Sequence, residues 1–375
     1  MKILTINTYA GSLLIAAQQD DLDEVVGSYE DVGYGSKIQA DNFPSLRVIS
    51  TRSAWPKQDL SDTVVIGHPP CAAFSIMSVV NEANVLGTAA PAFACTIDLL
   101  RYAFDSCAQA VAIESVPRAL EGARAVHDAL ANEYGYDVYR VLQNAASFGV
   151  GQWRPRFWCV FVQKALGHRP MTWYLKPDLR TCGQVLDELE GEGYLPFVQA
   201  DRQFHKACSQ LLAAGFSQDQ VRALLTGAGG YGQLHTCVWR YLGKPCKSNE
   251  VREQVKRKIF GGAFEHQLPN VFDPNGYAPT LISSCCWTYR GRPLSIEGYK
   301  ALMGFPLDYK IDRNPSQLRE WLSRGVCPPV ARWVLRMVKL HLRGIRITRF
   351  PDGAVVKVIA PGELADFRPK KVNCG

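Results

Sequence analysis

Short apolar runs rich in β-branched residues alternate with longer stretches of helical periodicity over the first part of the chain. Seven runs are predicted as strands: residues 2–7, 24–28, 46–50, 63–67, 110–114, 138–142 and 157–163. Apolar residues recur at helical spacing over 95–107, and a second helix is predicted over 120–133. Strands that alternate with helices in this way favour a doubly wound α/β sheet.

The same pattern divides the chain into segments. The strand and helix alternation covers residues 1–163, stops over 164–277, where Gly, His, Lys and Arg are more frequent, and resumes over 278–343 with helices predicted near 296–303 and 329–342. We therefore predict a catalytic α/β domain at 1–163 and 278–343 with a smaller module inserted at 164–277. Residues 344–375 are predicted to be a C-terminal tail and are assigned no function.

Composition adds only weak constraints. The chain has 42 Lys and Arg against 35 Asp and Glu, a net charge of +7, which suits a polyanionic partner without requiring one. The sequence contains neither a signal-peptide pattern nor an apolar run near the roughly 20 residues that span a bilayer. We expect an intracellular, cytoplasmic protein with no membrane partner; oligomeric state has no signature in the sequence.

The cysteines indicate a reducing compartment and no metal. Twelve cysteines are scattered along the chain without a CxxC pair. The nearest approach to a metal cluster is His235 and Cys237 with Cys246, or the Cys285-Cys286 doublet, and neither has zinc-finger spacing. Free thiols are the favoured interpretation.

Candidate chemistry follows three predicted strands, because ligands of such sheets collect beyond the strands' carboxyl ends. After the run 63–67 come His68-Pro69-Pro70-Cys71, a rigid turn that fixes a thiol at the strand's end. A free thiol has a pKa of about 8.5, so a nucleophilic cysteine needs activation by its surroundings. Taken alone, a cysteine after a proline turn is more often structural.

Two further elements carry charge. Glu114 ends the apolar run 110–114, and carboxylates are seldom buried without a partner. Arg154 and Arg156 alternate along an extended segment, so both side chains could point at one site, where a planar base edge or a phosphate would match their forked donors. A capping glutamate and two surface arginines are the simpler interpretations of each element by itself.

In order and spacing, three segments together resemble the catalytic motifs of the DNA cytosine-5 methyltransferases. They are Pro69-Pro70-Cys71-x-x-Phe74-Ser75, Glu114-x-Val116-Pro117, and the segment 144–156 that ends in Arg154-x-Arg156. Residues 278–282, 292–306 and 326–329 resemble the family's closing motifs. The resemblance covers about 2–161 and 277–338.

The resemblance implies a Rossmann-like methyltransferase sheet with a target-recognition domain at 164–277 and double-stranded DNA as the partner. Cys71 would add to carbon 6 of a flipped cytosine, and Glu114 would stabilise the ring at N3. Arg154 or Arg156 would place positive charge near the base. Flipping is needed because a stacked ring cannot be approached on one face.

The cofactor side departs from the family. S-adenosylmethionine is the implied donor, with Tyr9, Gly11, Glu30, Pro70 and Gly325 as its candidate binding residues. The first motif keeps Tyr9 and Gly11 but has leucines where the family has later glycines, and Gly325 stands where an asparagine is usual. The third motif, near 51–55, shows no carboxylate, and Ser115 replaces an asparagine.

These departures leave three alternatives open. One is a remodelled donor pocket that takes another one-carbon donor, such as methylenetetrahydrofolate, and yields hydroxymethylcytosine. A catalytically inactive DNA-binding relative is the second, although the intact catalytic motifs argue against it. The third is an RNA methyltransferase of the same fold, with a tRNA as substrate. The target DNA sequence cannot be deduced from the chain.

Overall fold

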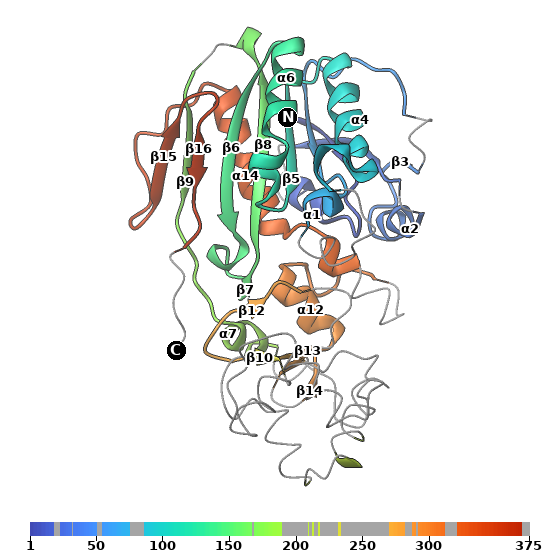
Figure 1. Ribbon diagram of the computed structural model, residues 1–375, viewed down its shortest axis with the longest axis vertical. Coiled ribbons are helices and arrows are strands. Elements are labelled where there is room, and N and C mark those ends of the chain that lie inside the picture. Colours follow the sequence, from blue (N-terminus) through green and yellow to red (C-terminus); the bar gives the residue numbers. More distant parts are fainter. Residues whose placement is uncertain are drawn as a thin grey trace.

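The computed structural model describes residues 1–18, 23–31, 33–50, 55–75, 86–166, 169–189, 209, 212–213, 217, 232–233, 270–281, 287–289, 292–311 and 321–369. Its centre is an eight-stranded sheet (Figure 1). The strands in chain order are β1 (Lys2–Ile6), β2 (Glu24–Tyr29), β3 (Val48–Ile49), β4 (Thr63–Gly67), β5 (Ala110–Ser115), β6 (Tyr136–Asn144), β8 (Pro155–Gln163) and β16 (Leu364–Asp366).

The spatial order of this sheet is β16-β6-β8-β5-β4-β1-β2-β3. Strand β8 is antiparallel to both neighbours, and all other pairs are parallel. The order changes direction at β1 and β4, so the chain winds outward to both sides from there. All seven predicted strands are present, and the predicted doubly wound α/β class is confirmed.

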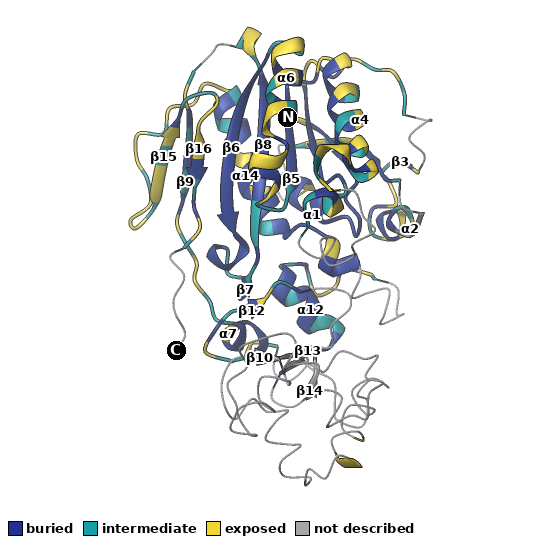
Figure 2. Cartoon of the chain, viewed as in Figure 1, coloured by how far each residue is buried: buried dark blue, intermediate teal, exposed yellow. Residues whose placement is uncertain are grey.

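Helices cover both faces of the sheet, as the near-continuous apolar strands require. Helices α1 (Ser12–Gln18) and α14 (Pro328–Leu342) pack on one face, and α4 (Pro91–Asp105) and α6 (Arg124–Tyr134) on the other. Along β4, Val64 and Ile66 join the first core cluster and Val65 joins the second, since successive side chains point to opposite faces. Figure 2 shows the buried strands between helices whose outer sides are exposed.

The four predicted helices are confirmed, with one divided. Residues 95–107 lie mostly in α4, and 120–133 fall in α5 (Ala119–Gly122) and α6, which ends at Gly135 with a positive φ of 75°. Helix α12 (Ile296–Met303) and α14 match the predictions at 296–303 and 329–342. The other elements are α2 (Gly33–Asn42), α7 (Cys182–Asp187), η2 (Cys71–Phe74), η3 (Gly87–Ala89), η4 (Ala145–Ser147), η5 (Lys164–Leu166), β7 (Gln152–Trp153), β9 (Met171–Leu175), β10 (Gly232–Gln233), β11 (Asn270–Val271), β12 (Ala278–Pro279), β13 (Trp287–Tyr289), β14 (Arg292–Pro293) and β15 (Val355–Ile359).

The C-terminal segment is part of the main core. Strand β15 pairs with β9, and β16 extends the large sheet by pairing with β6. Trp173 of β9 is fully buried, with its ring centroid 5.1 Å from that of Trp333 in α14. Residues 171–175, although they follow the predicted boundary at 164, therefore pack with the catalytic domain. The domain boundaries stay predictions, because most of 190–269 lies outside the described residues.

Candidate functional site

The site forms where two central strands end side by side. Strands β4 and β5 are parallel and in register, with Gly67 opposite Ile113. Cys71, in the loop after β4, and Glu114, next to the last residue of β5, therefore lie at the same edge of the sheet. This is the edge at which doubly wound sheets bind ligands.

Cys71 stands at the first position of the short helix η2. Pro70 precedes it with φ −53° and ψ 118°, and both prolines restrict the backbone to a narrow range. Behind the turn, the Phe74 ring packs edge-on against Phe93 of α4, with centroids 5.4 Å apart. The turn thus holds a partly exposed thiol on a rigid base.

Glu114 is buried and paired on both carboxylate oxygens. Its Oε1 lies 2.8 Å from Nε of Arg156, and its Oε2 lies 3.0 Å from Nε2 of His68. Glu114 is 1% exposed and His68 is 3% exposed. An anion so far from water is tolerated because two cationic partners neutralise it.

These charges set the protonation states around the thiol. Burial opposes ionisation of Glu114, but the charge of His68, with Arg156 and Arg154, outweighs it and lowers the carboxyl pKa. Burial would lower the pKa of His68, but Glu114 and Cys71 outweigh it and raise that pKa to about 9. Burial also opposes ionisation of Cys71, yet His68 and Arg156 lower the thiol pKa below its ordinary value.

Arg154 lies beside this group but is oriented differently. Its Nη2 donates to the carbonyl oxygens of Ser323 and Gly325 at 2.9 and 2.6 Å, while Nε and Nη1 are buried without a hydrogen-bond partner. Burial, then the neighbouring Arg156, lowers the pKa of Arg154 to about 10. The two predicted arginines are therefore brought together, with Arg156 on Glu114 and Arg154 linking the site to the loop at 325.

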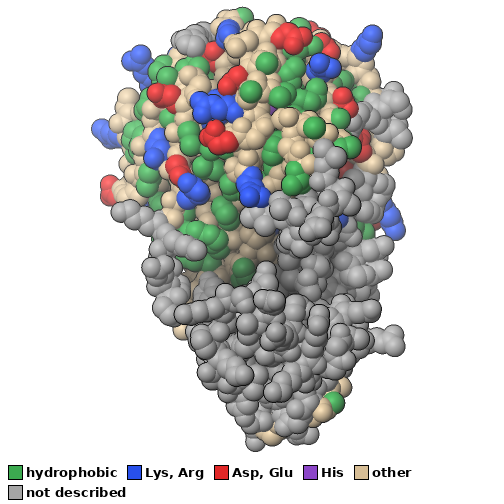
Figure 3. Space-filling view, in the orientation of Figure 1, with side chains coloured by type: hydrophobic (Ala, Val, Ile, Leu, Met, Phe, Trp, Pro, Cys, Tyr) green, Lys and Arg blue, Asp and Glu red, His purple; other side chains and the backbone are tan. Residues whose placement is uncertain are grey.

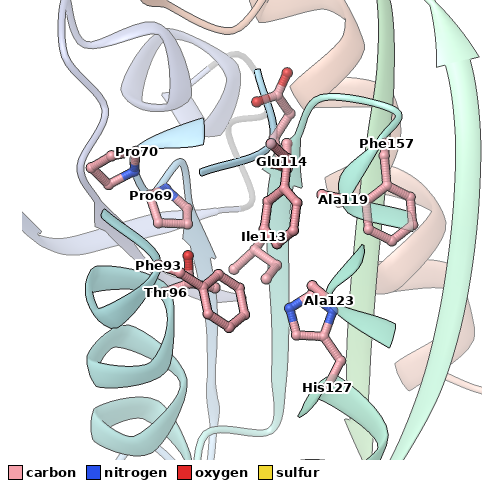
Figure 4. Close-up of a pocket in the computed structure, with 12 residues that line it drawn as sticks. Pro69, Pro70, Phe93, Thr96, Ile113, Glu114, Ala119, Ala123, His127 and Phe157 are labelled. Carbon is pink, nitrogen blue, oxygen red and sulfur yellow. The ribbon is translucent and has the colours of Figure 1, made fainter. Parts of the chain in front are cut away.

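A pocket lies beneath the catalytic turn (Figure 4). Apolar side chains of the catalytic turn, of the α5 region and of α4, β5 and β8 form most of its wall, and Glu114 lies at its upper end. His127 of α6 faces it from below, its ring nitrogens without a hydrogen-bond partner among the described residues, and burial, then the charge of Arg140, lowers its pKa to about 4. The lining residues are Pro69, Pro70, Phe74, Phe93, Thr96, Ile113, Glu114, Ser115, Ala119, Ala123, His127 and Phe157.

The predicted cofactor-side residues meet on the other side of His68. The backbone N–H of Tyr9 donates to Oε2 of Glu30 at 2.7 Å, and Nε2 of Gln39 donates to the same oxygen at 3.0 Å. Glu30 is 0% exposed. The Tyr9 ring lies 5.2 Å from the His68 ring, centroid to centroid, so the base side and this side are in contact.

Gly11 lies beneath a tyrosine from the far end of the chain. The Tyr309 hydroxyl donates to the carbonyl oxygen of Ala10 at 2.6 Å, and a β-carbon on Gly11 would collide with that hydroxyl. Gly11 has φ +78°, a conformation that glycine adopts freely. Leu13 and Leu14, which replace glycines of the family, lie in α1 with their side chains in the core.

Gly325 is joined to both sides. Its carbonyl oxygen accepts from Arg154, and the next residue, Val326, donates its N–H to Oγ of Ser12 at 3.2 Å. Ordinary van der Waals space remains for a β-carbon at this glycine. The backbone at Gly325 therefore lies close to the first-motif segment, through the contact with Ser12.

Charge on the described surface is mixed. On the face in Figure 3, basic and acidic side chains are interspersed over the upper part of the molecule. Among the described residues no helix combines the length and apolarity that a membrane crossing needs, and no three His, Cys, Asp or Glu side chains gather as metal ligands. The pairs at 235–246 and 285–286 lie outside those residues.

Comparison with known proteins identifies the family. The sequence model of the C-5 cytosine-specific DNA methylases matches residues 2–339. The chain belongs to this family. No curated protein matches the sequence.

Solved structures of methyltransferases share the fold. A DNA modification methyltransferase encoded within a prophage of E. coli superposes with a TM-score of 0.57 at 16% identity, covering 92% of this chain and 99% of that one. DNMT2 from Spodoptera frugiperda, solved as a mutant, gives 0.54 at 14%, covering 90% and 99%. The Entamoeba histolytica methyltransferase EhMeth gives 0.56 at 11%, covering 91% and 98%. The Rossmann-like methyltransferase fold is thereby confirmed.

Methylases of this family generally use S-adenosylmethionine, and the described cofactor-side residues do not fit it as they lie here. Glu30 would have to meet the ribose hydroxyls, but it is 0% exposed and its Oε2 accepts from Tyr9 and Gln39. Close approach to the first-motif backbone is blocked at Gly11, where Tyr309 lies. Binding of this cofactor would require both contacts to open.

Sequence reasoning missed three residues of the site: His68, Gln39 and Tyr309. His68 had a signal, because it stands in the same loop as Cys71 at the carboxyl end of a buried strand. Gln39 and Tyr309 had none, since each acts through a contact between segments far apart in the sequence.

Proposed function

We propose that this protein is a DNA (cytosine-5-)-methyltransferase that activates cytosine through Cys71. The observation that carries the proposal is the arrangement of a partly exposed thiol on a rigid turn beside a buried carboxylate held by Arg156 and His68. Family membership supplies DNA as the substrate class. Cys71, Glu114, Arg154 and Arg156 are the proposed catalytic residues.

Activation is needed because carbon 5 of cytosine is a poor nucleophile. The Cys71 thiolate adds to carbon 6, and the electron pair of the C5–C6 double bond becomes available at carbon 5. Negative charge that develops on the ring is neutralised at N3 by a proton delivered through Glu114. Arg156 holds Glu114 in place, and the buried cations lower the cost of the anionic species.

The base must leave the helix to reach this thiol. Cys71 lies at the end of a buried strand, so a cytosine stacked in a duplex could not present its face to the sulfur. Extrusion costs a few kcal/mol, which contacts in the pocket and to phosphates would offset. The proposed target-recognition domain at 164–277 would supply the phosphate and groove contacts.

A second candidate function is transfer of a different one-carbon group. It is favoured by one observation, namely that Tyr309 covers Gly11 and that Glu30 is engaged by Tyr9 and Gln39. A donor such as methylenetetrahydrofolate would give hydroxymethylcytosine from the same activated ring. The chemistry at Cys71 is common to both candidates.

Covalent trapping tests the proposal. Duplex DNA containing 5-fluorocytosine is incubated with the protein and, in separate reactions, with S-adenosylmethionine or methylenetetrahydrofolate. A denaturation-resistant protein–DNA adduct at Cys71 is expected, because fluorine at carbon 5 prevents the final elimination. An adduct with one donor only identifies the group transferred, and an adduct at another residue would contradict the assignment of Cys71.

A further inference from the structure

His68 touches both halves of the site. It follows β4 directly and precedes Cys71 by three residues. Its Nε2 lies 3.0 Å from Oε2 of Glu114, and its ring packs against that of Tyr9. Its Nδ1 is buried, and the ring interacts with the Cys71 side chain as well as with Glu114.

The proposed chemistry leaves two protons to be placed. The Cys71 thiol must lose a proton before its sulfur can attack carbon 6. Glu114 must gain one before it can donate to N3, because its cationic neighbours hold it ionised. Cys71 therefore gives up the proton that Glu114 lacks, and His68 is the neighbour of both.

We propose that His68 carries the proton from the Cys71 thiol to the Glu114 carboxylate. This inference rests on the proposed function and adds a residue to it. While Cys71 is still a thiol, His68 is neutral with its proton on Nε2. Its Nδ1 accepts the thiol proton, which gives the imidazolium and the thiolate, and Nε2 then releases its own proton to Oε2 of Glu114.

The atoms and charges balance over the addition. The sulfur–carbon 6 bond forms from the thiolate electron pair, the C5–C6 π pair moves towards C4, and N3 takes the proton from Glu114. His68 ends neutral with its proton on Nδ1, and Glu114 ends as a carboxylate. The ring is then a neutral, electron-rich adduct, so no oxidant or additional acid is required.

No other charged neighbour of Glu114 in the described part of the chain can do this. Arg156 contacts Glu114 from β8, but a guanidinium does not release its proton at physiological pH. Arg154 is turned towards the carbonyl oxygens of Ser323 and Gly325. The Tyr9 ring packs on the imidazole and restricts its orientation.

The direction of each pKa shift agrees with proton transfer between Cys71, His68 and Glu114. The pKa of His68 is raised to about 9, because Glu114 and Cys71 outweigh burial. The thiol pKa of Cys71 is lowered, because His68 and Arg156 outweigh burial. An imidazolium between a thiolate and a carboxylate is thus the favoured resting form, one step along the proposed transfer.

The test compares His68→Gln with the wild type. Glutamine retains an N–H donor near the position of Nε2 but cannot carry a proton. The first measurement is the pH dependence of Cys71 alkylation by iodoacetamide, followed on the Cys71 peptide by mass spectrometry. The second is release of tritium from carbon 5 of cytosine in labelled, mixed-sequence duplex DNA, which reports addition at carbon 6 without any donor.

For the wild type we expect alkylation to persist well below the ordinary thiol pKa of about 8.5. In His68→Gln it should move to that value, and tritium release should fall on the order of 100-fold with a changed pH profile. His68→Asn should show the same two changes. The melting temperatures of both variants are measured to confirm that each is folded. His341→Gln, at a buried histidine of α14 outside the site, is the matched control and should leave both profiles unchanged.

Two failures are distinguishable. Tritium release by the wild type with unaltered alkylation and release profiles in both His68 variants would overturn the proton carrier and leave the proposed function intact. Absence of tritium release by the wild type would remove the proposed function itself, and the inference that rests on it.

Discussion

The base side and the cofactor side of this site use buried polar groups in opposite ways. On the base side, Glu114, Arg156 and His68 satisfy one another and surround a thiol that stays partly exposed. On the cofactor side, Glu30 accepts hydrogen bonds from Tyr9 and Gln39, and Tyr309 covers Gly11. The first arrangement prepares a reacting atom, and the second closes the surface that a ligand would use.

The comparison shows that a site can keep the groups that activate the base while the groups that would bind the one-carbon donor change. Charged groups that set the protonation of Cys71 lie on strands β5 and β8 and directly after β4, which the core holds in place. The cofactor-side contacts include Gln39 of α2 and Tyr309, which lie outside these strands. Divergence of the donor pocket is therefore possible without disturbing base activation, as the remodelled-donor hypothesis requires.

Loss of the nucleophile should have the largest effect. In Cys71→Ala, tritium release from carbon 5 of cytosine should fall to background, because no other group can add to carbon 6. Cys95→Ala, at a partly exposed cysteine in α4, is the control and should retain the wild-type rate. Residual release by Cys71→Ala would show that the base side does not act through this thiol.

Removal of the acid should come next. Glu114→Gln should reduce tritium release by roughly 10²- to 10⁴-fold, the usual contribution of a general acid. The variant also leaves His68 and Arg156 without their anion, so its melting temperature is measured in parallel. Glu121→Gln, at an exposed carboxylate in α5, controls for loss of one charge. Equal rates for the wild type and Glu114→Gln would contradict the role of Glu114.

Low pH should reduce the free energy of unfolding through protonation of His127. Its pKa is about 4 in the folded protein against about 6.5 unfolded, so its contribution to stability is complete above pH 6.5 and is lost as pH falls towards 4. The loss is about 3 kcal/mol at most. Urea unfolding at pH 7 and pH 4.5 should show a smaller difference for His127→Leu than for the wild type. An unchanged difference would mean that other groups set the acid sensitivity.

Opening the cofactor side should have a moderate effect. Tyr309→Ala removes the hydroxyl that lies on Gly11, and binding of S-adenosylmethionine by calorimetry should strengthen by about tenfold, or 1.4 kcal/mol. Tyr309→Phe is the matched variant, which loses the hydrogen bond to Ala10 but keeps the ring. Weaker binding in both variants would mean that Tyr309 helps to hold the cofactor and does not exclude it.

The smallest effect is expected at Gly11 itself. Gly11→Ala should destabilise the protein by about 1–2 kcal/mol because φ is +78°. The new methyl group also meets the Tyr309 hydroxyl, so part of any excess cost should disappear in the double variant with Tyr309→Phe. Simple additivity of the two substitutions would show that the contact carries no strain.

The fold was predictable to the extent that it depends on local periodicity. Strands such as β4 and β5 are continuous apolar runs, and helices such as α12 and α14 show clear amphipathic spacing, so both kinds were predicted near their true bounds. Strands β15 and β16 were missed. The exposed valines of β15 and the three-residue length of β16 give little periodic signal, and pairing with β9 and β6 fixes these strands only in the folded chain.

Part of the site was predictable for a related reason. Cys71 lies in the loop after one buried strand and Glu114 near the end of its neighbour, so their proximity comes from strand order. The contacts of Glu30 with Gln39, and of Tyr309 with Ala10, join segments with no common pattern. They depend on packing between segments 9 and 299 residues apart, which a single sequence does not encode in any local signal.

The most direct test is to express the wild type and Cys71→Ala in bacteria, digest the DNA to nucleosides and identify new cytosine species by mass spectrometry. The account predicts a C5-modified cytosine with the wild type, either methylcytosine or hydroxymethylcytosine, and none with Cys71→Ala. A modified cytosine that persists in Cys71→Ala would contradict covalent activation through this residue.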